Sequence, residues 1–333
     1  MVLIFMSKQD IPMLKGWDFK DNEIQEALKN NLMLMLDTET SNLCNLWCLY
    51  CYRAEYGKQG KKVLWKEFDL NERKDLVDQA KDLRCRTIKI VGAGEPLIDK
   101  FFWFHVEYIH DVGITPVIFT NGIGLTKEDA MRLYDLDVSI IIKMNSLDEK
   151  IEDKIVGRKG YAKERDKALN NLISVGFNKS NPTRLGVDAV ITKLNKDDII
   201  KTFEFCRNNN IFPEFKSFIP TGASIKLKHW EVSKEELMKI FTEAKRIDKE
   251  KHGLEYDVTL PYIGGFPCKQ LHFAMFVNIL GEVYPCPGSR QLLGNIREKN
   301  LKDIWNGNKM KRIRNTTYNS CLPREEYWSN SKL

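Results

Sequence analysis

The sequence lacks any apolar run that approaches the roughly 20 residues needed to cross a membrane. Its apolar opening, Met1–Met6, is too short for the hydrophobic core of a signal peptide and is soon followed by charged residues. Internal repeats and low-complexity segments are also lacking, which argues against a repeat protein. These absences together predict a globular protein of the cytoplasm.

Charge of one sign is nowhere concentrated. The net charge of +6 comes from 52 Lys and Arg that are interspersed with 46 Asp and Glu. This pattern argues against a dedicated nucleic-acid surface but allows an anionic small substrate. A hydrophobic content of 43% and 333 residues are typical of a chain with a substantial core and about two domains.

The eight cysteines do not indicate a disulfide framework, because the expected compartment is reducing. Cys206 falls inside a helical pattern and Cys85 follows Leu83 at a helix end, and both are expected to be small core residues. The other six fall into two groups, which are Cys44, Cys48 and Cys51 near the start and Cys268, Cys286 and Cys321 near the end.

The first group has the spacing C-x3-C-x2-C and directly follows a predicted strand. Three thiolates on one short loop can hold three irons of a cuboidal [4Fe–4S] cluster and leave the fourth iron open to a ligand. The alternatives are a zinc knot or buried structural cysteines. Zinc usually takes a fourth Cys or His nearby, and none stands close in the sequence. The spacing therefore favours a reactive iron–sulfur cluster.

Predicted strands alternate with predicted helices along the first two thirds of the chain. The strands are expected at 33–37, from 87 into a glycine turn at 92–96, and at 115–119, 138–143, 185–192 and 215–219. The helices are expected at 22–30, 72–83, 101–109, 162–175 and 196–208, with a further one opened by a capping box of Thr126 and Asp129. This alternation predicts parallel βαβ units and hence an α/β fold, a partial (β/α)6 TIM-like barrel. In such barrels functional residues lie at the carboxyl ends of the strands, where the cysteine loop and the glycine turn both fall.

A change of composition follows the sixth strand. Ser233 with Glu236 opens a long amphipathic helix that ends near Gly253, and a hairpin is expected to turn at Gly281. We place a domain boundary between about 230 and 255.

Over residues 31–230 these motifs resemble those of radical S-adenosylmethionine (SAM) enzymes. The aromatic residue before the last cysteine of that family's triad corresponds to Tyr50, and its Gly-Gly-Glu-Pro motif corresponds to Gly92-Ala-Gly-Glu-Pro96, with Ala93 as a departure. The resemblance implies that the open iron binds SAM, and that Gly92, Gly94 and Glu95 bind the methionine amino group. An ammonium needs acceptors, and a tight glycine turn exposes carbonyl oxygens beside a carboxylate.

Further cofactor contacts follow from the same resemblance. Ser146 and Arg158 match residues that hold the methionine carboxylate, a task that suits the planar donors of arginine. The others are Asn121 and Lys143 near the ribose, and Val190, Ile191 and Ile219 beside the adenine. The alternative for each is a strand-end polar residue or a core residue that contacts no ligand.

The second cysteine group is similar to the C-x9–15-G-x4-C pattern of SPASM and twitch extensions. Cys268 and Cys286 flank Gly281 at this spacing, and Cys321 would be a third ligand of an auxiliary [4Fe–4S] cluster. The further cysteine run of a full SPASM domain is lacking, which favours the twitch type, and structural zinc is the alternative. We expect an N-terminal extension at 1–30, a core barrel at 31–235 and a small cluster-binding extension of a β-hairpin and helices at 236–333.

The resemblance implies a reaction. One electron, from a donor such as flavodoxin or ferredoxin, cleaves SAM to methionine and a 5′-deoxyadenosyl radical, which removes a hydrogen atom from the substrate. The auxiliary cluster can accept an electron, which gives net oxidation. Candidates for substrate contact or proton transfer inside the barrel are Asp37, Glu39, Asp188 and Lys216. Structural charge pairs are the alternative for these four.

The substrate is the least specified part. Only 43 residues precede Cys44, too few for the peptide-recognition domain of many relatives that modify ribosomal peptides. We therefore expect a small metabolite, such as a sugar, an aminocyclitol or a nucleoside. The alternatives are a peptide maturase that epimerises or cross-links, and a non-catalytic iron–sulfur or zinc scaffold. The chain is expected to be a monomer or a homodimer.

Overall fold

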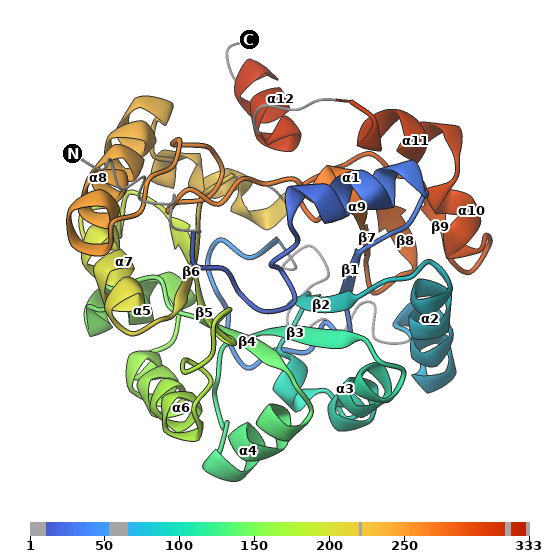
Figure 1. The fold of residues 1–333 in the computed structure, drawn as a ribbon. Helices are drawn as coiled ribbons and strands as arrows, with labels where there is room; N and C mark the ends of the chain where they lie inside the picture. The colour runs from blue at the N-terminus through green and yellow to red at the C-terminus, as the bar shows by residue number, and fades with distance from the viewer. Residues whose placement is uncertain (1–10, 53–65, 220–221, 317–320, 331–333) are drawn as a thin grey trace, which may run out of the picture.

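The computed structural model describes residues 11–52, 66–219, 222–316 and 321–330, so the opening Met1–Met6 lies outside it. Six parallel strands follow one another in chain order around the molecule (Figure 1). They are β1 (Met35–Glu39), β2 (Thr87–Gly92), β3 (Thr115–Thr120), β4 (Ser139–Lys143), β5 (Leu185–Ile191) and β6 (Phe212–Ser217). The partial (β/α)6 barrel that the alternation predicted is confirmed.

Helices cover the outer face of these strands. They are α2 (Leu70–Asp82), α3 (Phe102–Asp111), α4 (Lys127–Asp135), α5 (Glu149–Val156), α6 (Tyr161–Val175) and α7 (Ile199–Asn208). The expected capping box of Thr126 and Asp129 begins α4. The prediction missed α5, which Asp148 caps by accepting hydrogen bonds from two backbone N–H groups.

Alternate residues of each strand face the helices or the barrel interior, as the two-residue period of a strand requires. Ile88 and Ile118 belong to the large core beneath the helices, together with the buried thiols Cys85 and Cys206. Val117 and Ile141 belong to a second core inside the barrel. The two lone cysteines are thus core residues, as predicted.

The sixth strand begins three residues earlier than predicted. The expectation rested on the apolar run 215–219, whereas β6 starts at Phe212 and pairs with β5. Glu214 and Lys216 alternate with apolar residues there, and such interior charges hide a strand from a search for hydrophobic runs. Pro213 is tolerated because β6 lies at the edge of the sheet.

The N-terminal segment closes the amino end of the barrel. Leu14 bridges Thr183 just before β5, and the Lys15 ammonium pairs with Asp137 just before β4 at 2.6 Å. The Trp17 ring lies inside the barrel and carries the Lys89 ammonium 3.6 Å from its centroid. Helix α1 (Asp21–Lys29) follows. The interior is therefore covered at the end opposite the cysteine loop.

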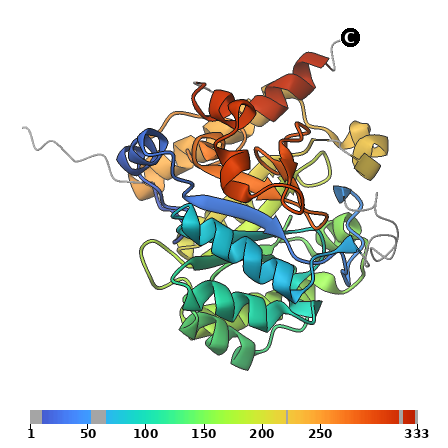
Figure 2. The same ribbon diagram turned by 90° about the vertical axis from the view of Figure 1, so that its right-hand side faces the viewer.

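The C-terminal part continues the same sheet (Figure 2). Strand β7 (Ala274–Val277) pairs in parallel with β1, and β8 (Glu282–Tyr284) and β9 (Gly294–Asn295) follow antiparallel. The predicted turn at Gly281 is confirmed, with a φ of +81°. The sheet thus runs unbroken from the barrel into the expected extension, and the boundary at 235 stays a prediction.

The remaining helical elements frame the extension. They are α8 (Lys234–His252), α9 (Gln270–Phe273), α10 (Leu301–Trp305), α11 (Asn308–Arg314), α12 (Leu322–Asn330) and the 3-10 segments η4 (Pro96–Ile98) and η5 (Gly222–Trp230). The predicted capping box at Ser233 and the left-handed end at Gly253 bound α8. None of the helices in the described ranges is long and apolar enough to cross a membrane.

Candidate active site at the carboxyl ends of the strands

The cysteine loop leaves β1 at its carboxyl end. Cys44, Cys48 and Cys51 are half-buried and form no disulfide. The Cys51 N–H donates to the Cys48 carbonyl at 3.0 Å, and the Leu46 N–H donates to the Cys44 sulfur at 3.4 Å. The Leu49 N–H donates to the Ile155 carbonyl at the end of α5. Local turns and this helix therefore set where the three sulfurs lie.

These thiols fit a cluster. Burial raises the pKa of Cys48 well above its usual range, and charge repulsion from Cys51 and Cys44 adds to that rise. Thiolates held so close need a cationic group between them. No three His, Cys, Asp or Glu side chains in the described part of the chain could hold a single metal ion. In an iron–sulfur cluster each thiolate binds its own iron, and three thiols on one short loop fit such a cluster.

The glycine turn after β2 lies directly against this loop. The Gly94 N–H donates to the Ser41 carbonyl and the Glu95 N–H to the Leu43 carbonyl, both at 2.7 Å. A Cβ at Gly94 would lie 1.8 Å from the Leu43 oxygen, so only glycine fits. Gly92 has a φ of +147° and accepts a hydrogen bond from Thr40. The turn and the cysteine loop are thus one packed unit, whereas the expected contact of the turn with the methionine amino group stays a prediction.

Glu95 ties this unit to β3. Its carboxylate is buried and accepts hydrogen bonds from the Leu97 N–H, the Thr120 hydroxyl and the Asn121 N–H at 3.1, 2.5 and 2.7 Å. Burial raises its pKa to about 7, although the hydrogen bonds oppose that rise. A carboxylate offers about four acceptor sites, so one remains, and the expected contact with the methionine ammonium stays a prediction.

Two further predicted cofactor residues converge on Asn45, which lies between the first two cysteines. The Asn121 side-chain amide donates to the Asn45 side-chain oxygen at 2.7 Å. The Arg158 guanidinium donates to the Asn45 carbonyl at 3.3 Å and to Glu164 at 2.8 Å. The Arg158 side chain is 36% exposed, so its charge remains accessible beside the loop.

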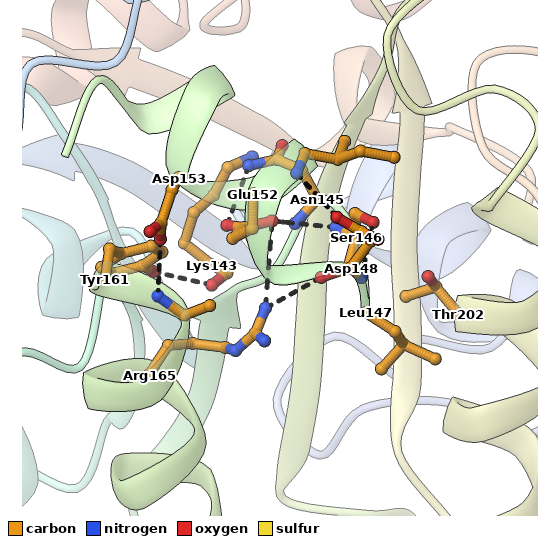
Figure 3. A network of polar contacts seen from close by, with 12 residues as sticks. Lys143, Asn145, Ser146, Leu147, Asp148, Glu152, Asp153, Tyr161, Arg165 and Thr202 are labelled. Carbon is orange, nitrogen blue, oxygen red and sulfur yellow. Dashed lines mark hydrogen bonds and ion pairs between the residues drawn. The ribbon is translucent and has the colours of Figure 1, made fainter. Parts of the chain in front are cut away.

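Ser146 has a different place. It is fully buried, and the Asp148 N–H donates to its hydroxyl (Figure 3). That hydroxyl donates to Asp198 at 2.5 Å. The hydroxyl hydrogen is therefore used within the loop after β4. The contact of Ser146 with the methionine carboxylate stays a prediction.

Glu152 organises that loop, and sequence reasoning missed it (Figure 3). Its buried carboxylate accepts hydrogen bonds from the Asn145 and Ser146 N–H groups at 2.7 and 2.8 Å and faces Arg165 at 3.9 Å. Burial raises the pKa of Glu152, against the effect of Arg165. The missed helix α5 carries this residue, so its N-cap Asp148 is the signal that could have revealed it.

Asn145 joins two other predicted contacts. Its side-chain oxygen accepts hydrogen bonds from the Tyr50 hydroxyl at 3.4 Å and the Val190 N–H at 3.3 Å. Val190 also packs with Phe218, and Tyr50 lies against the same cluster. Asn145 therefore fixes the aromatic residue of the cysteine loop to the end of β5. Ile219 lies half-buried just past β6.

An ionic group occupies the barrel interior below this mouth. Asp188 accepts hydrogen bonds from the Lys143 and Lys216 ammoniums at 2.8 and 2.9 Å, and Lys216 also pairs with Glu214 at 2.6 Å. Burial alone would raise the pKa of Asp188, but the two ammoniums outweigh it and lower that pKa. Burial raises the pKa of Glu214 to about 8. The Lys216 side chain is 30% exposed, which leaves it accessible to a ligand.

The other two candidate catalytic residues face the C-terminal part. Asp37 pairs with Lys89 at 3.2 Å and accepts a hydrogen bond from Gln270. Glu39 accepts hydrogen bonds from the Tyr52 hydroxyl and from the Ile279 N–H, and burial raises its pKa to about 7. These contacts join β1 to the extension and favour the structural alternative for both.

The second set of thiols borders the same interior. Cys268, Cys286 and Cys321 are half-buried and free, and they come from the loop before α9, the segment after β8 and the start of α12. Burial raises the pKa of Cys268 to about 12, and repulsion from Cys321 adds to the rise. Burial raises the pKa of Cys286, and repulsion from Cys321 and Cys268, which lie within electrostatic range, adds to the rise. This donor set also fits an iron–sulfur cluster.

Comparisons with known proteins match both halves of this arrangement. Residues 38–206 match the radical SAM superfamily, and residues 268–324 match SPASM, an iron–sulfur cluster-binding domain. The chain is 25% identical over 292 residues to the AdoMet-dependent heme synthase of Methanosarcina barkeri, which covers 79% of each chain. It is 30% identical over 169 residues to the mycofactocin maturase MftC of Mycolicibacterium smegmatis, and this match spans 50% of this chain but only 40% of that protein.

Solved structures share the fold. Streptococcus suis SuiB bound to its precursor peptide SuiA superposes with a TM-score of 0.67 at 19% identity, over 89% of this chain and 70% of that one. The peptide-bound anSMEcpe structure has a TM-score of 0.57 at 17% identity, over 84% of this chain and 82% of that one.

Proposed function

The chain belongs to the radical SAM superfamily, and from that premise we propose that it removes a hydrogen atom from a polar small metabolite and oxidises it. Its cofactors are SAM, the [4Fe–4S] cluster that binds SAM and an auxiliary [4Fe–4S] cluster. The observation that carries the proposal is the ionic group of Lys143, Asp188 and Lys216. Lys143 lies in electrostatic range of Cys48, and Lys216 pairs through its backbone with Tyr262, which lies in electrostatic range of Cys268 and Cys321. A polar substrate placed there would have both cofactors within reach.

Different residues of this chain would bind the first cluster and SAM. Cys44, Cys48 and Cys51 would hold the first cluster, and the Gly92–Glu95 turn and Arg158 would bind the methionine part of SAM. When bound, cluster and SAM supply the one-electron cleavage that yields a 5′-deoxyadenosyl radical. The chain itself orients the substrate and excludes competing hydrogen donors.

Substrate orientation would fall to the interior charges. Lys216 has the greatest side-chain exposure among Lys143, Asp188 and Lys216 and would contact the substrate directly. Asp188 fixes the positions of both ammoniums, since it accepts a hydrogen bond from each. Glu214, whose pKa lies near 8, is suited to exchange a proton near neutral pH.

A metabolite is favoured by the match to the heme synthase, which spans most of both chains and acts in the synthesis of a small molecule. Peptide modification is the second candidate, supported by the maturase MftC and by SuiB, which was solved with a precursor peptide. We further propose that the protein acts in the cytoplasm, because cysteine thiols stay reduced in a reducing compartment. A flavodoxin or ferredoxin would supply the electrons there.

The proposal is tested with anaerobically reconstituted protein, dithionite and SAM. We expect release of 5′-deoxyadenosine, and iron and sulfide contents of about eight each, as two [4Fe–4S] clusters require. Cys48→Ala should abolish release, whereas Cys286→Ala should retain it while iron falls by about half. Protein that binds both clusters but releases no 5′-deoxyadenosine would contradict the catalytic proposal, and zinc without sulfide would indicate a scaffold.

A further inference from the structure

Arg324 lies on the first turn of α12, three residues after Cys321. Its backbone N–H donates to the Cys321 carbonyl at 3.0 Å, so the two residues share one helical turn. The guanidinium then donates to the carbonyl of Ser217, the last residue of β6, at 2.9 Å. Arg324 is only 5% exposed. The residue therefore sits between the second set of thiols and the barrel wall.

Sulfur and oxygen atoms lie near this guanidinium. Its side chain hydrogen-bonds with the Cys321 thiol, and Cys268 and the Tyr262 hydroxyl lie within electrostatic range. The backbone of Tyr262 forms an isolated antiparallel β-bridge with that of Lys216. One arginine therefore contacts the auxiliary site and the strand that carries the interior lysine.

Burying a guanidinium has a large cost, because arginine stays charged in proteins. A link between α12 and β6 alone would need only a neutral donor to the Ser217 carbonyl. The charge is useful where the thiols are thiolates that ligate a cluster. A cation and an N–H donor beside a ligating sulfur stabilise the reduced, more negative form of such a cluster, and this raises its reduction potential.

We propose that Arg324 is a positioning residue that sets the potential of the auxiliary cluster, so that the cluster accepts an electron from the barrel interior. The inference rests on the cluster bound by Cys268, Cys286 and Cys321 and does not depend on the identity of the substrate. It concerns a residue that contacts a ligating thiol and carries no ligand atom itself.

The test is a potentiometric titration of the holoprotein followed by electron paramagnetic resonance. Arg324→Gln should shift the auxiliary midpoint potential to more negative values while iron content stays that of wild type. Arg324→Lys keeps the charge but not the fork of donors, and should recover most of the shift. A chain with Cys44, Cys48 and Cys51 changed to Ala retains only the auxiliary signal, which removes overlap with the first cluster.

Arg314→Gln is the matched control. Arg314 is also a buried arginine of the C-terminal part, and it donates to the Trp305 carbonyl and to Asn31. Its loss should lower the melting temperature and leave the potential unchanged. An unchanged potential in Arg324→Gln with full iron content would overturn the proposal and leave Arg324 a structural link.

Two further outcomes are also decisive. If Arg324→Gln loses the cluster, Arg324→Lys carries the test: a small negative shift with wild-type iron supports the proposal, because the charge is kept and the fork of donors is lost, and a potential equal to that of wild type contradicts it. A lysine variant that binds the cluster but shows the full negative shift would contradict it. Release of 5′-deoxyadenosine is measured separately, so failure of the catalytic proposal is distinguished from failure of this one.

Discussion

Gly94→Ala should disable the first cluster site without unfolding the chain. The new Cβ would lie 1.8 Å from the Leu43 carbonyl oxygen, whereas real Cβ contacts keep at least 3.0 Å, so the two backbones must separate by at least 1.2 Å. Both hydrogen bonds between the glycine turn and the cysteine loop then lengthen or break. Overpacking of this kind costs about 1–3 kcal/mol of stability, and a misplacement of about 1 Å can cost roughly 100-fold in rate.

The assay compares iron content, melting temperature and the rate of 5′-deoxyadenosine release. Gly113→Ala is the matched control, because Gly113 has a φ of +83° and a Cβ added there would meet no atom within 4 Å. The control should lose about 1 kcal/mol through the left-handed backbone alone and keep its rate. If Gly94→Ala released 5′-deoxyadenosine at the rate of the control, the cysteine loop and the glycine turn would not form one rigid unit.

Three other changes test the site. Asp188→Asn takes the shared carboxylate from Lys143 and Lys216, whose side chains are only partly buried, and should destabilise the fold by about 3 kcal/mol in urea unfolding. A loss no larger than that of a surface pair would contradict the ionic group. The pKa of Glu95 rises from 4.5 to about 7 on folding. Between these two pH values the folded chain keeps a proton that the unfolded chain has lost. The free energy of unfolding therefore falls as the pH rises from 4.5 to about 7, by about 3 kcal/mol in total. Glu95→Gln should flatten that slope, and an unaltered slope would assign it to other groups. Asn121→Ala removes the hydrogen bond to Asn45, worth about 1 kcal/mol, and should slow 5′-deoxyadenosine release several-fold with iron content unchanged; an equal loss of iron would indicate a structural role only.

Local signals predicted most of the fold. The capping boxes at Thr126 and Ser233 and the hairpin at Gly281 depend on residues a few positions apart, and each is present as expected. The strand β6 was misplaced because its inward residues Glu214 and Lys216 are charged, and a hydrophobic search discards them. Charges inside a barrel are visible only once the partner strands are known.

The site was predictable only where a short motif carries it. The cysteine triad and the glycine turn lie within a few residues each, whereas the partners that hold them come from distant parts of the chain. Asn45 is held by Asn121 and Arg158, and Asn145 joins Tyr50 to Val190. Neither asparagine belongs to a local pattern. Sequence spacing cannot reveal hydrogen bonds between residues separated by 45 to 113 positions.

The placement of the interior charges argues for where a substrate would lie. Lys143 lies in electrostatic range of the Cys48 thiol. Lys216 forms an isolated antiparallel β-bridge with Tyr262. Tyr262 in turn lies in electrostatic range of Cys268 and Cys321. The amino end of the barrel is filled by the apolar core around Trp17 and Leu14. A polar substrate that enters from the carboxyl end would meet the ionic group there. The inward charges of β6, which a search for hydrophobic runs discards, are thus the residues that we expect to contact the substrate.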